Sequence, residues 1–305
     1  MRIGLTGGGS SVTRIIDQAK RAEDQGFTSL WFPSAVLGDP LVAMSIAGHG
    51  TTTLELGTAV LQTYSCHPAL QGARAAAAAV AMGRPGLTLG VGPSHQPVVE
   101  LMQGLDYSHP GRHTEEYVQI LGRLLRGEGV AFEGEEFRVH VQPHPLPDGF
   151  TVPLLVAALG PRLLRVAGQH ADGTITWMAN AQAVRSHVAP RIRAAAEGAG
   201  RPAPRIVVGL PVAVHDDAAA ARTVAAEQFA MYGTLPNYQR ILEHGDAPGP
   251  GDAAIVGDEA AVGAQIEELF AAGATDVWAA PFPVGDDRKA STTRTRALLK
   301  ELAAA

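Results

Sequence analysis

The residues best suited to chemistry follow an apolar run in the stretch LTLGVGPSHQPVVE, residues 87–100. Gly90 and Gly92 would let the backbone turn tightly and approach a ligand closely. Ser94 and the N–H groups around it could hold an anion at the start of a helix. The stretch is not a Rossmann fingerprint, because the third glycine and the acidic residue are missing, and it lacks the Gly-Lys-Ser/Thr of a P-loop. We interpret it as an anion-binding turn, with an ordinary strand-to-helix turn as the alternative.

His95 is the only titratable side chain inside this turn, and histidine titrates near neutral pH. It could donate a proton to a substrate or hydrogen-bond a ring carbonyl; alternatively, it caps the following helix. His140 and His144 stand in a proline-rich stretch, which opposes the helix that a metal-binding pair at this spacing needs. No apolar run carries a His-x-His pattern, and no Gly-x-Ser-x-Gly nucleophile elbow occurs. We therefore expect no metal site.

A second turn of small residues follows the apolar run in LLVAALGPRLLRVAG, residues 154–168. The small residues at positions 157–160 leave room for a ligand, and Pro161 is preorganised for the first position of a helix. Arg162 would add a positive charge beside that helix N-terminus, unless it is an ordinary solvated helix residue. If the two runs form adjacent strands, their turns face each other and both tolerate an anion.

Aromatic residues end three of the apolar runs. Trp31 is expected in the core, whereas Tyr64 and Trp177 could wall a flat ligand. A pocket with apolar walls, few polar groups and phosphate-tolerant turns suits a cofactor built from a ring and a phosphate.

The elements that must position these residues alternate along the whole chain. Apolar runs separated by amphipathic segments are typical of a parallel sheet covered by helices on both faces. Eight such units favour a closed (β/α)8 barrel of α/β class, with the site at the C-terminal ends of the strands, over an open doubly wound sheet. The eight predicted strands span residues 2–6, 29–33, 54–61, 87–92, 153–158, 173–178, 205–214 and 276–282.

Two insertions interrupt this alternation of apolar runs and amphipathic segments. We nevertheless expect residues 1–305 to form one domain. After the fourth strand, residues 130–149 predict a small hairpin and a proline-rich loop. After the seventh strand, residues 232–259 predict an extra helix and a flexible Pro/Gly-rich loop, 245–257, which we expect to cover the pocket.

Composition narrows the class of protein. The 305 residues carry a net charge of -6, which gives no support for a nucleic-acid partner. Cys66 is the only cysteine, which excludes an internal disulfide and indicates a reducing cytoplasm. No stretch approaches the roughly 20 consecutive apolar residues of a membrane helix, and the first residues do not look like a secretion signal. We therefore expect a cytoplasmic protein with a small-molecule substrate and no membrane partner.

Several blocks, in this order, resemble the bacterial luciferase-like monooxygenase superfamily, and more narrowly its coenzyme F420-dependent (deazaflavin) oxidoreductases of actinobacterial type. The blocks are WFPS, LELGTAVLQTYSCHPAL, LTLGVGPSHQPVVE, FEGEEFRV, LLVAALGPRLLRVAGQHADGTITWM and RPAPRIVVGLPVAV. The similarity covers nearly the whole chain. The resemblance implies a (β/α)8 barrel that binds F420 at the strand C-termini, with FMN as the alternative cofactor. It also implies a homodimer.

The resemblance further implies site residues. A non-prolyl cis peptide at Ala59-Val60 would support the ring, and His95 stands where a sugar-phosphate dehydrogenase of the family carries a glutamate that acts in proton transfer. Tyr64 and Trp177 would line the substrate pocket. The implied cofactor-binding residues are Ser34, Ala59, Val60, Gln62, Gly92, Pro93, Ser94, His95, Ala157, Ala158, Leu159, Gly160, Pro161 and Arg162.

One departure from the family pattern affects the expected reaction. Many relatives carry an acidic residue and a histidine just after the second strand, where this chain has Ser34 and Ala35. Without that acid/base pair, we favour reduction of an activated C=C, C=N or C=O bond, with His95, a tyrosine or water as the proton source. The alternatives are an FMN-dependent monooxygenase, a cofactor carrier without turnover and, last, a metal-dependent barrel hydrolase.

Overall fold

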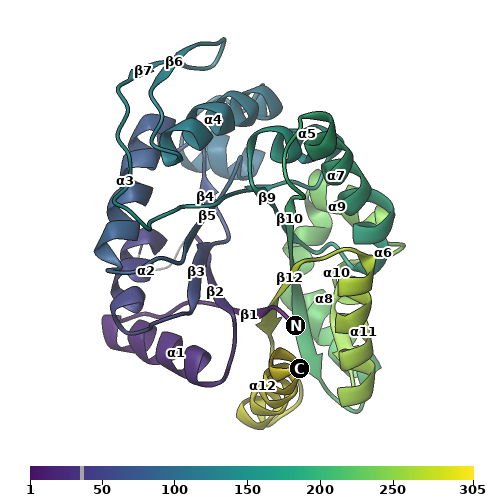
Figure 1. Ribbon diagram of the computed structural model, residues 1–305. Coiled ribbons are helices and arrows are strands. Elements are labelled where there is room, and N and C mark those ends of the chain that lie inside the picture. The colour runs from purple at the N-terminus through teal and green to yellow at the C-terminus, as the bar shows by residue number, and fades with distance from the viewer. Residues whose placement is uncertain (35–37) are drawn as a thin grey trace.

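Eight parallel strands close into a barrel in the computed structural model, which describes residues 1–34 and 38–305. Around the barrel the strands follow the order β1-β2-β3-β5-β8-β9-β10-β12, and β12 pairs back with β1. The short strands β4 and β11 extend this sheet by pairing with β5 and β10. Figure 1 shows the helices surrounding the ring of strands. The predicted closed (β/α)8 barrel is confirmed, and the open sheet was the wrong alternative.

The elements have the following bounds. The strands are β1 (Ile3–Thr6), β2 (Ser29–Phe32), β3 (Glu55–Thr58), β4 (Leu61–Gln62), β5 (Leu87–Gly92), β6 (Val130–Glu133), β7 (Arg138–Val141), β8 (Leu154–Ala157), β9 (Gly173–Trp177), β10 (Arg205–Val214), β11 (Ile255–Gly257) and β12 (Asp276–Pro281). The helices are α1 (Val12–Asp24), α2 (Pro40–His49), α3 (Pro68–Ala81), α4 (Pro110–Leu125), α5 (Pro161–His170), α6 (Ala181–Ala183), α7 (Ala189–Gly198), α8 (Ala218–Gln228), α9 (Pro236–His244), α10 (Pro250–Ala253), α11 (Glu259–Ala272) and α12 (Arg288–Ala304), with the π-helical turns η2 (Val98–Met102) and η3 (Val184–Val188) and the 3-10 turn η4 (Ala230–Thr234).

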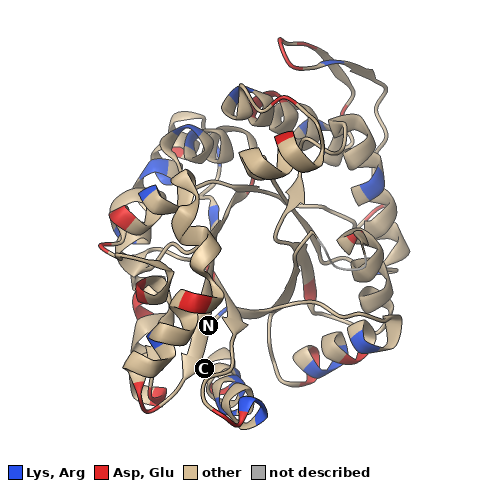
Figure 2. Ribbon diagram, turned by 180° about the vertical axis from the view of Figure 1, so that it is seen from behind, with Lys and Arg blue, Asp and Glu red and all other residues tan. Residues whose placement is uncertain are grey.

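Local sequence explains these elements. All six residues of β5 and all four of β2 are buried, because the barrel interior covers one face of each strand and helices cover the other. In α1, the Ser11 side chain caps the N-terminus, and Ile15 and Ala19 face the strands. Gly26 follows the helix with a φ of 81°, a conformation that glycine adopts without steric cost. Figure 2 shows charged residues mainly on the outer helices.

Two tryptophans fill the barrel interior. Trp31 is fully buried and Trp278 is 7% exposed, and both belong to an apolar cluster inside the ring of strands. A Cβ atom on Gly57 would lie 2.3 Å from the Trp31 ring, and one on Gly209 would lie 2.0 Å from the Trp278 ring. The indole rings therefore need glycine on neighbouring strands, and a ligand must bind above this packed layer.

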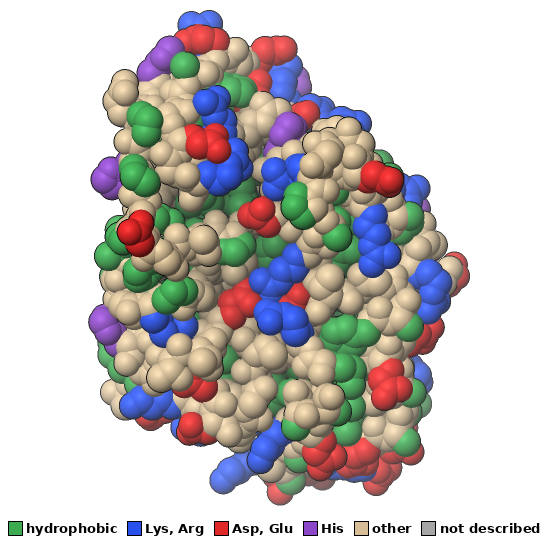
Figure 3. Space-filling model, viewed as in Figure 1, with side chains coloured by type: hydrophobic (Ala, Val, Ile, Leu, Met, Phe, Trp, Pro, Cys, Tyr) green, Lys and Arg blue, Asp and Glu red, His purple; other side chains and the backbone are tan. Residues whose placement is uncertain are grey.

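An ion-pair network closes the end of the barrel where the strands begin. Arg205 donates to both Asp276 and Glu55 at 2.6–2.9 Å, and Arg2 bonds the same two carboxylates at 2.7 Å. Burial alone would raise the pKa of Asp276, but the two arginines lower it. Figure 3 shows basic and acidic side chains side by side near the middle of its view. The network stabilises this end, which leaves the opposite end for a ligand.

The insertions lie where the sequence predicted them, but one of them has a different role. Strands β6 and β7 form the predicted antiparallel hairpin, which projects from the barrel in Figure 1. Residues 245–257 were predicted to be a flexible loop that covers the pocket, and this prediction was wrong. They contain α10 and β11, are largely buried, and pack on α8 and β10, because their alanines and prolines fill the space beside those elements.

Candidate active site

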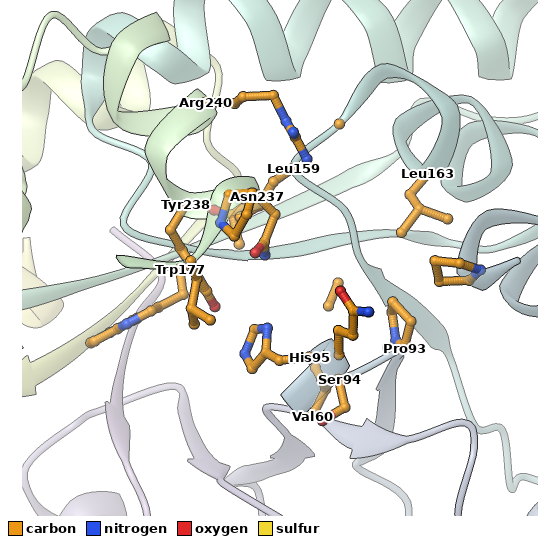
Figure 4. Close-up of a pocket in the computed structure, with 18 of the residues that line it drawn as sticks. Val60, Pro93, Ser94, His95, Leu159, Leu163, Trp177, Asn237, Tyr238 and Arg240 are labelled. Atoms are coloured by element: carbon orange, nitrogen blue, oxygen red, sulfur yellow. The ribbon is translucent and has the colours of Figure 1, made fainter. Parts of the chain in front are cut away.

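A cavity of about 790 Å³ opens at the C-terminal ends of the strands. Its floor is formed by Val60, Ile175 and Trp278, and its rim by the turns after β5 and β8 and by α9. Figure 4 shows side chains from these elements around the cavity. This volume lies in the upper part of the range for small-molecule sites.

The turn after β5 is held in an unusual backbone conformation. Ser94 has a φ of 63°, which non-glycine residues rarely adopt, and its carbonyl oxygen accepts a hydrogen bond of 3.0 Å from the Tyr107 hydroxyl. Gly92 packs so closely that a Cβ atom there would lie 2.8 Å from the Cβ of Ala157 on β8. This contact brings the two predicted turns to the same side of the cavity, where Pro93, Ser94 and His95 all line it.

The turn after β8 presents a helix N-terminus to the cavity. Gly160 is the N-cap of α5, no side chain caps that helix, and Pro161 takes its first position. Free N–H groups and the helix dipole favour an anion here. A Cβ atom on Gly160 would meet nothing within 4 Å. Arg162 also lines the cavity and forms a 3.0 Å ion pair with Glu115 on α4.

A buried histidine that no local sequence pattern indicates holds this second turn in place. The Nε2 atom of His187 donates a 2.7 Å hydrogen bond to the carbonyl oxygen of Leu159, which lines the cavity. His187 is 2% exposed, and burial lowers its pKa despite this bond. Only the tertiary contact between η3 and the turn marks it, because its own surroundings in the sequence resemble an ordinary helix.

His95 is partly buried in the cavity wall. Among the residues that the structure describes, none hydrogen-bonds its imidazole, so it does not cap the following helix through its side chain. Its ring lies 5.7 Å from the ring of Tyr238, and burial lowers its pKa. The imidazole is therefore mainly neutral at pH 7, and it lines the cavity without a hydrogen bond to a described side chain.

Another part of the cavity wall comes from α9 and β9. Asn237, Tyr238 and Arg240 line the cavity from α9, and Trp177 lines it from the end of β9. Trp177 packs against Trp278 at 5.0 Å and against Tyr232 at 5.9 Å between ring centroids. The sequence predicted Trp177 and an extra helix here, but it did not assign any residue of that helix to the site.

Several of the predicted site residues lie away from the cavity. Tyr64 stacks on His113 at 3.8 Å, behind Tyr107, which takes the predicted place in the wall. Ala158 is fully buried in the core, because successive side chains near a strand end point to opposite faces.

Ser34 and Gln62 do not line the cavity either. The Gln62 side chain instead accepts a 2.6 Å hydrogen bond from Gln103, and Ala35 lies outside the described residues.

The other predicted site residues meet at the cavity. The Ala59-Val60 peptide is cis, as the resemblance implied, and both residues line the cavity between β3 and β4. The remaining predicted residues in the lining are Gly92, Pro93, Ser94, His95, Ala157, Leu159, Gly160, Pro161, Arg162 and Trp177. Within residues 1–34 and 38–305, no three His, Cys, Asp or Glu side chains are grouped to hold a metal ion, and no helix is long and apolar enough to span a membrane.

Comparisons with known proteins agree with this geometry. The family model described as Luciferase-like monooxygenase matches residues 2–291. An uncharacterized protein of Mycobacterium tuberculosis, Rv1360, is 28% identical over 256 residues, which cover 77% of this chain and 73% of the relative. The F420-dependent glucose-6-phosphate dehydrogenase of Mycobacterium avium is 34% identical over 140 residues, 44% of this chain and 41% of the relative.

Among solved structures, the coenzyme F420-dependent tetrahydromethanopterin reductase of Methanopyrus kandleri superimposes with a TM-score of 0.76. The superposition covers 99% of this chain and 98% of the reductase. Because the sequence identity is 19%, it shows that the two chains share a fold and no more.

Proposed function

Because the chain belongs to the luciferase-like monooxygenase family, we propose that it is an F420-dependent oxidoreductase that transfers a hydride between the deazaflavin and a small organic substrate. One observation carries this proposal: the turns after β5 and β8 lie side by side on one wall of a large apolar cavity, and the second turn opens the uncapped N-terminus of α5 to it. This arrangement suits a flat ring that carries a phosphate.

The residues present fit such a cofactor. Gly160 leaves open space in front of the α5 N-terminus, where a phosphate would accept hydrogen bonds from the backbone. Arg162 would add positive charge at the same point. Ala59 and Val60 would support one face of the ring from the floor of the cavity, and Trp177 would close the side toward the substrate. F420-dependent relatives support this cofactor over FMN.

The protein would position the substrate and handle a proton. When bound, reduced F420 would supply a hydride to the substrate. One proton must also reach the substrate from the protein or from water, and His95 and Tyr238 line the cavity where that proton is needed. Burial lowers the pKa of His95, so its protonated form becomes available mainly in mildly acid solution. Trp177 and Tyr238 would exclude water from this side of the ring.

We propose reduction of an activated C=C, C=N or C=O bond as the reaction. The family resemblance leads one to expect an acidic side chain just after β2, where this chain has Ser34. Ser34 does not line the cavity. Oxidation of an alcohol by the route of such relatives needs the acid/base pair that this chain lacks after β2, whereas reduction needs only a hydride and one proton.

The first experiment is a titration of the cofactor-free protein with F420 and, in parallel, with FMN, followed by fluorescence. Preferential binding of F420 supports the proposal, and reduced F420 would then be tested with a panel of enones, imines and ketones. Preferential binding of FMN would instead favour a monooxygenase, with oxygen uptake as the next measurement. Binding of neither would refute a flavin or deazaflavin role for the cavity.

We also propose a cytoplasmic homodimer. Val42 on α2 and Leu70 and Val80 on α3 are 44–56% exposed, and the two helices are neighbours on the outside of the barrel. A second copy could cover these apolar side chains. Light scattering on the purified protein, with Leu70→Glu as the test variant, would show whether that face holds two copies together.

A further inference from the structure

The charged residues of the cavity are unevenly paired. Arg162 and Arg240 both line it, whereas no Asp, Glu or Lys occurs among its described lining residues. Arg162 is partly neutralised by its 3.0 Å ion pair with Glu115. The ion pairs formed within residues 1–34 and 38–305 do not include Arg240, whose side chain is exposed at the mouth. Arg240 therefore brings a positive charge to the cavity that no described side chain balances.

The backbone around Arg240 favours the same kind of ligand. α9 has nine residues, its N-cap Leu235 provides no side-chain cap, and Pro236 takes its first position. Residues 234–238 line the cavity, so the positive end of the helix dipole opens onto it about one turn before Arg240. In Figure 4, Arg240 reaches from α9 toward Leu159, and Asn237 is drawn between Arg240 and His95.

We propose that Arg240, with Asn237 and the first turn of α9, binds a carboxylate or phosphate oxyanion of a ligand in the cavity. Asn237 offers an amide N–H₂ donor and Arg240 a guanidinium that can take an oxyanion through two parallel hydrogen bonds. This inference rests on the proposed function in one respect: it takes the α5 turn as the place of the cofactor phosphate, so that α9 serves a different anion.

The neighbouring side chains indicate what the rest of that ligand should look like. Tyr238 follows Asn237 directly, and Trp177 stands beside α9 with its ring packed between Trp278 and Tyr232. A flat apolar body against these rings, with an anionic group about one helical turn away, would match both parts of the wall. An anionic substrate of this kind and the acidic tail of F420 offer the same oxyanion chemistry.

The test compares Arg240→Met with Arg165→Met. Arg165 is an exposed arginine on α5 that does not line the cavity, so both variants lose one positive charge and differ only in its position. Benzoate and its neutral analogue benzamide are titrated by calorimetry into each protein, with and without bound F420. Each protein is also titrated with F420 and with its chromophore lacking the phosphate and glutamyl tail. A thermal melt of each variant checks that it is folded.

We expect Arg240→Met to weaken benzoate binding roughly tenfold, the size of one charge-assisted hydrogen bond at a partly exposed site, and to leave benzamide unchanged. The difference should shrink as salt is added. Loss confined to benzoate assigns the oxyanion to the substrate. Loss confined to intact F420, with the tail-less chromophore unaffected, assigns it to the cofactor tail.

The proposal is overturned if Arg240→Met changes neither titration, or if Arg165→Met has the same effect. It is equally overturned if benzoate does not bind the wild-type protein and the affinity for F420 does not depend on Arg240. Failure of the wild-type protein to bind F420 would contradict the proposed function alone, because benzoate binding to the cofactor-free protein would still test Arg240.

Discussion

Replacing Gly160 with leucine should separate cofactor binding from folding. Gly160 has a φ of −92° and a ψ of 160°, an extended conformation that leucine adopts without strain. A Cβ atom there meets no other atom within 4 Å, so the new side chain would enter the cavity in front of the α5 N-terminus. We expect the free energy of unfolding to change by no more than about 0.5 kcal/mol, as for other substitutions that disturb no contact.

The substitution should instead weaken binding of the cofactor through its phosphate. A hydrogen bond between a backbone N–H and a charged phosphate contributes about 1.5–3 kcal/mol. Gly160→Leu would displace the phosphate from one or two such groups, a loss of about 3 kcal/mol. Since each 1.4 kcal/mol is a factor of ten, the affinity for F420 should fall on the order of 100-fold.

A fluorescence titration with F420 and a thermal melt of the same preparation measure the two quantities. Gly198→Leu is the matched control, because a Cβ atom there also meets nothing within 4 Å and the residue lies at the exposed end of α7. Gly92→Ala would not serve, since its Cβ would press on Ala157 and disturb the barrel itself. If Gly160→Leu folds normally and binds F420 within a few-fold of wild type, the phosphate does not lie at the α5 turn.

Three further predictions concern protonation and stability. His95→Asn should reduce turnover on an active substrate more than it reduces F420 affinity, and equal losses of rate and affinity would indicate a structural role. The wild-type rate should rise as the pH falls through a His95 pKa below 6.5, and the variant should lack this rise. Arg205→Met leaves the Asp276 carboxylate, whose side chain is 2% exposed, with Arg2 as its only remaining cation. The free energy of unfolding should therefore drop by about 3–5 kcal/mol and the Tm by roughly 5–8 °C, and an unchanged Tm would contradict the stabilising role of the network. Burial opposes ionisation of Glu23, but the N–H groups of residues 52–54 lower its pKa from 4.5 to about 2. Its contribution to the free energy of unfolding is therefore present above pH 4.5 and lost as the pH falls toward 2. Glu23→Gln should lower that free energy by about 1–2 kcal/mol at pH 7 after allowance for solvent screening and little at pH 2, and denaturant unfolding at both pH values checks this.

Much of the fold could be predicted from the sequence because its signals are local. The eight apolar runs became eight barrel strands within a few residues of their predicted bounds, since strands buried on both faces must be continuously apolar. The third run was the exception: the cis peptide Ala59-Val60 divides it into β3 and β4. Helix starts at Pro68 and Pro161 followed from the fixed φ of proline.

The candidate site was only half predictable. The turns after β5 and β8 could be found because small residues follow apolar runs, and a parallel barrel brings strand ends together. The α9 wall could not be found, because Tyr238 meets His95 across more than a hundred residues of sequence. Tyr64 was misplaced for the same reason: its position after a strand was right, but packing on His113 turned it behind Tyr107.

The sequence by itself thus determined the barrel, the end at which its cavity opens and the two turns of small residues that line it, because each depends on the order of apolar, small and helix-starting residues along the chain. Only the tertiary structure decided which side chains reach the cavity. Ala158 faces the core while Ala157 and Leu159 line the cavity, and His187 reaches the Leu159 carbonyl from a separate segment. Side-chain direction depends on how neighbouring elements pack, and that contact information is not present in any single stretch of the chain.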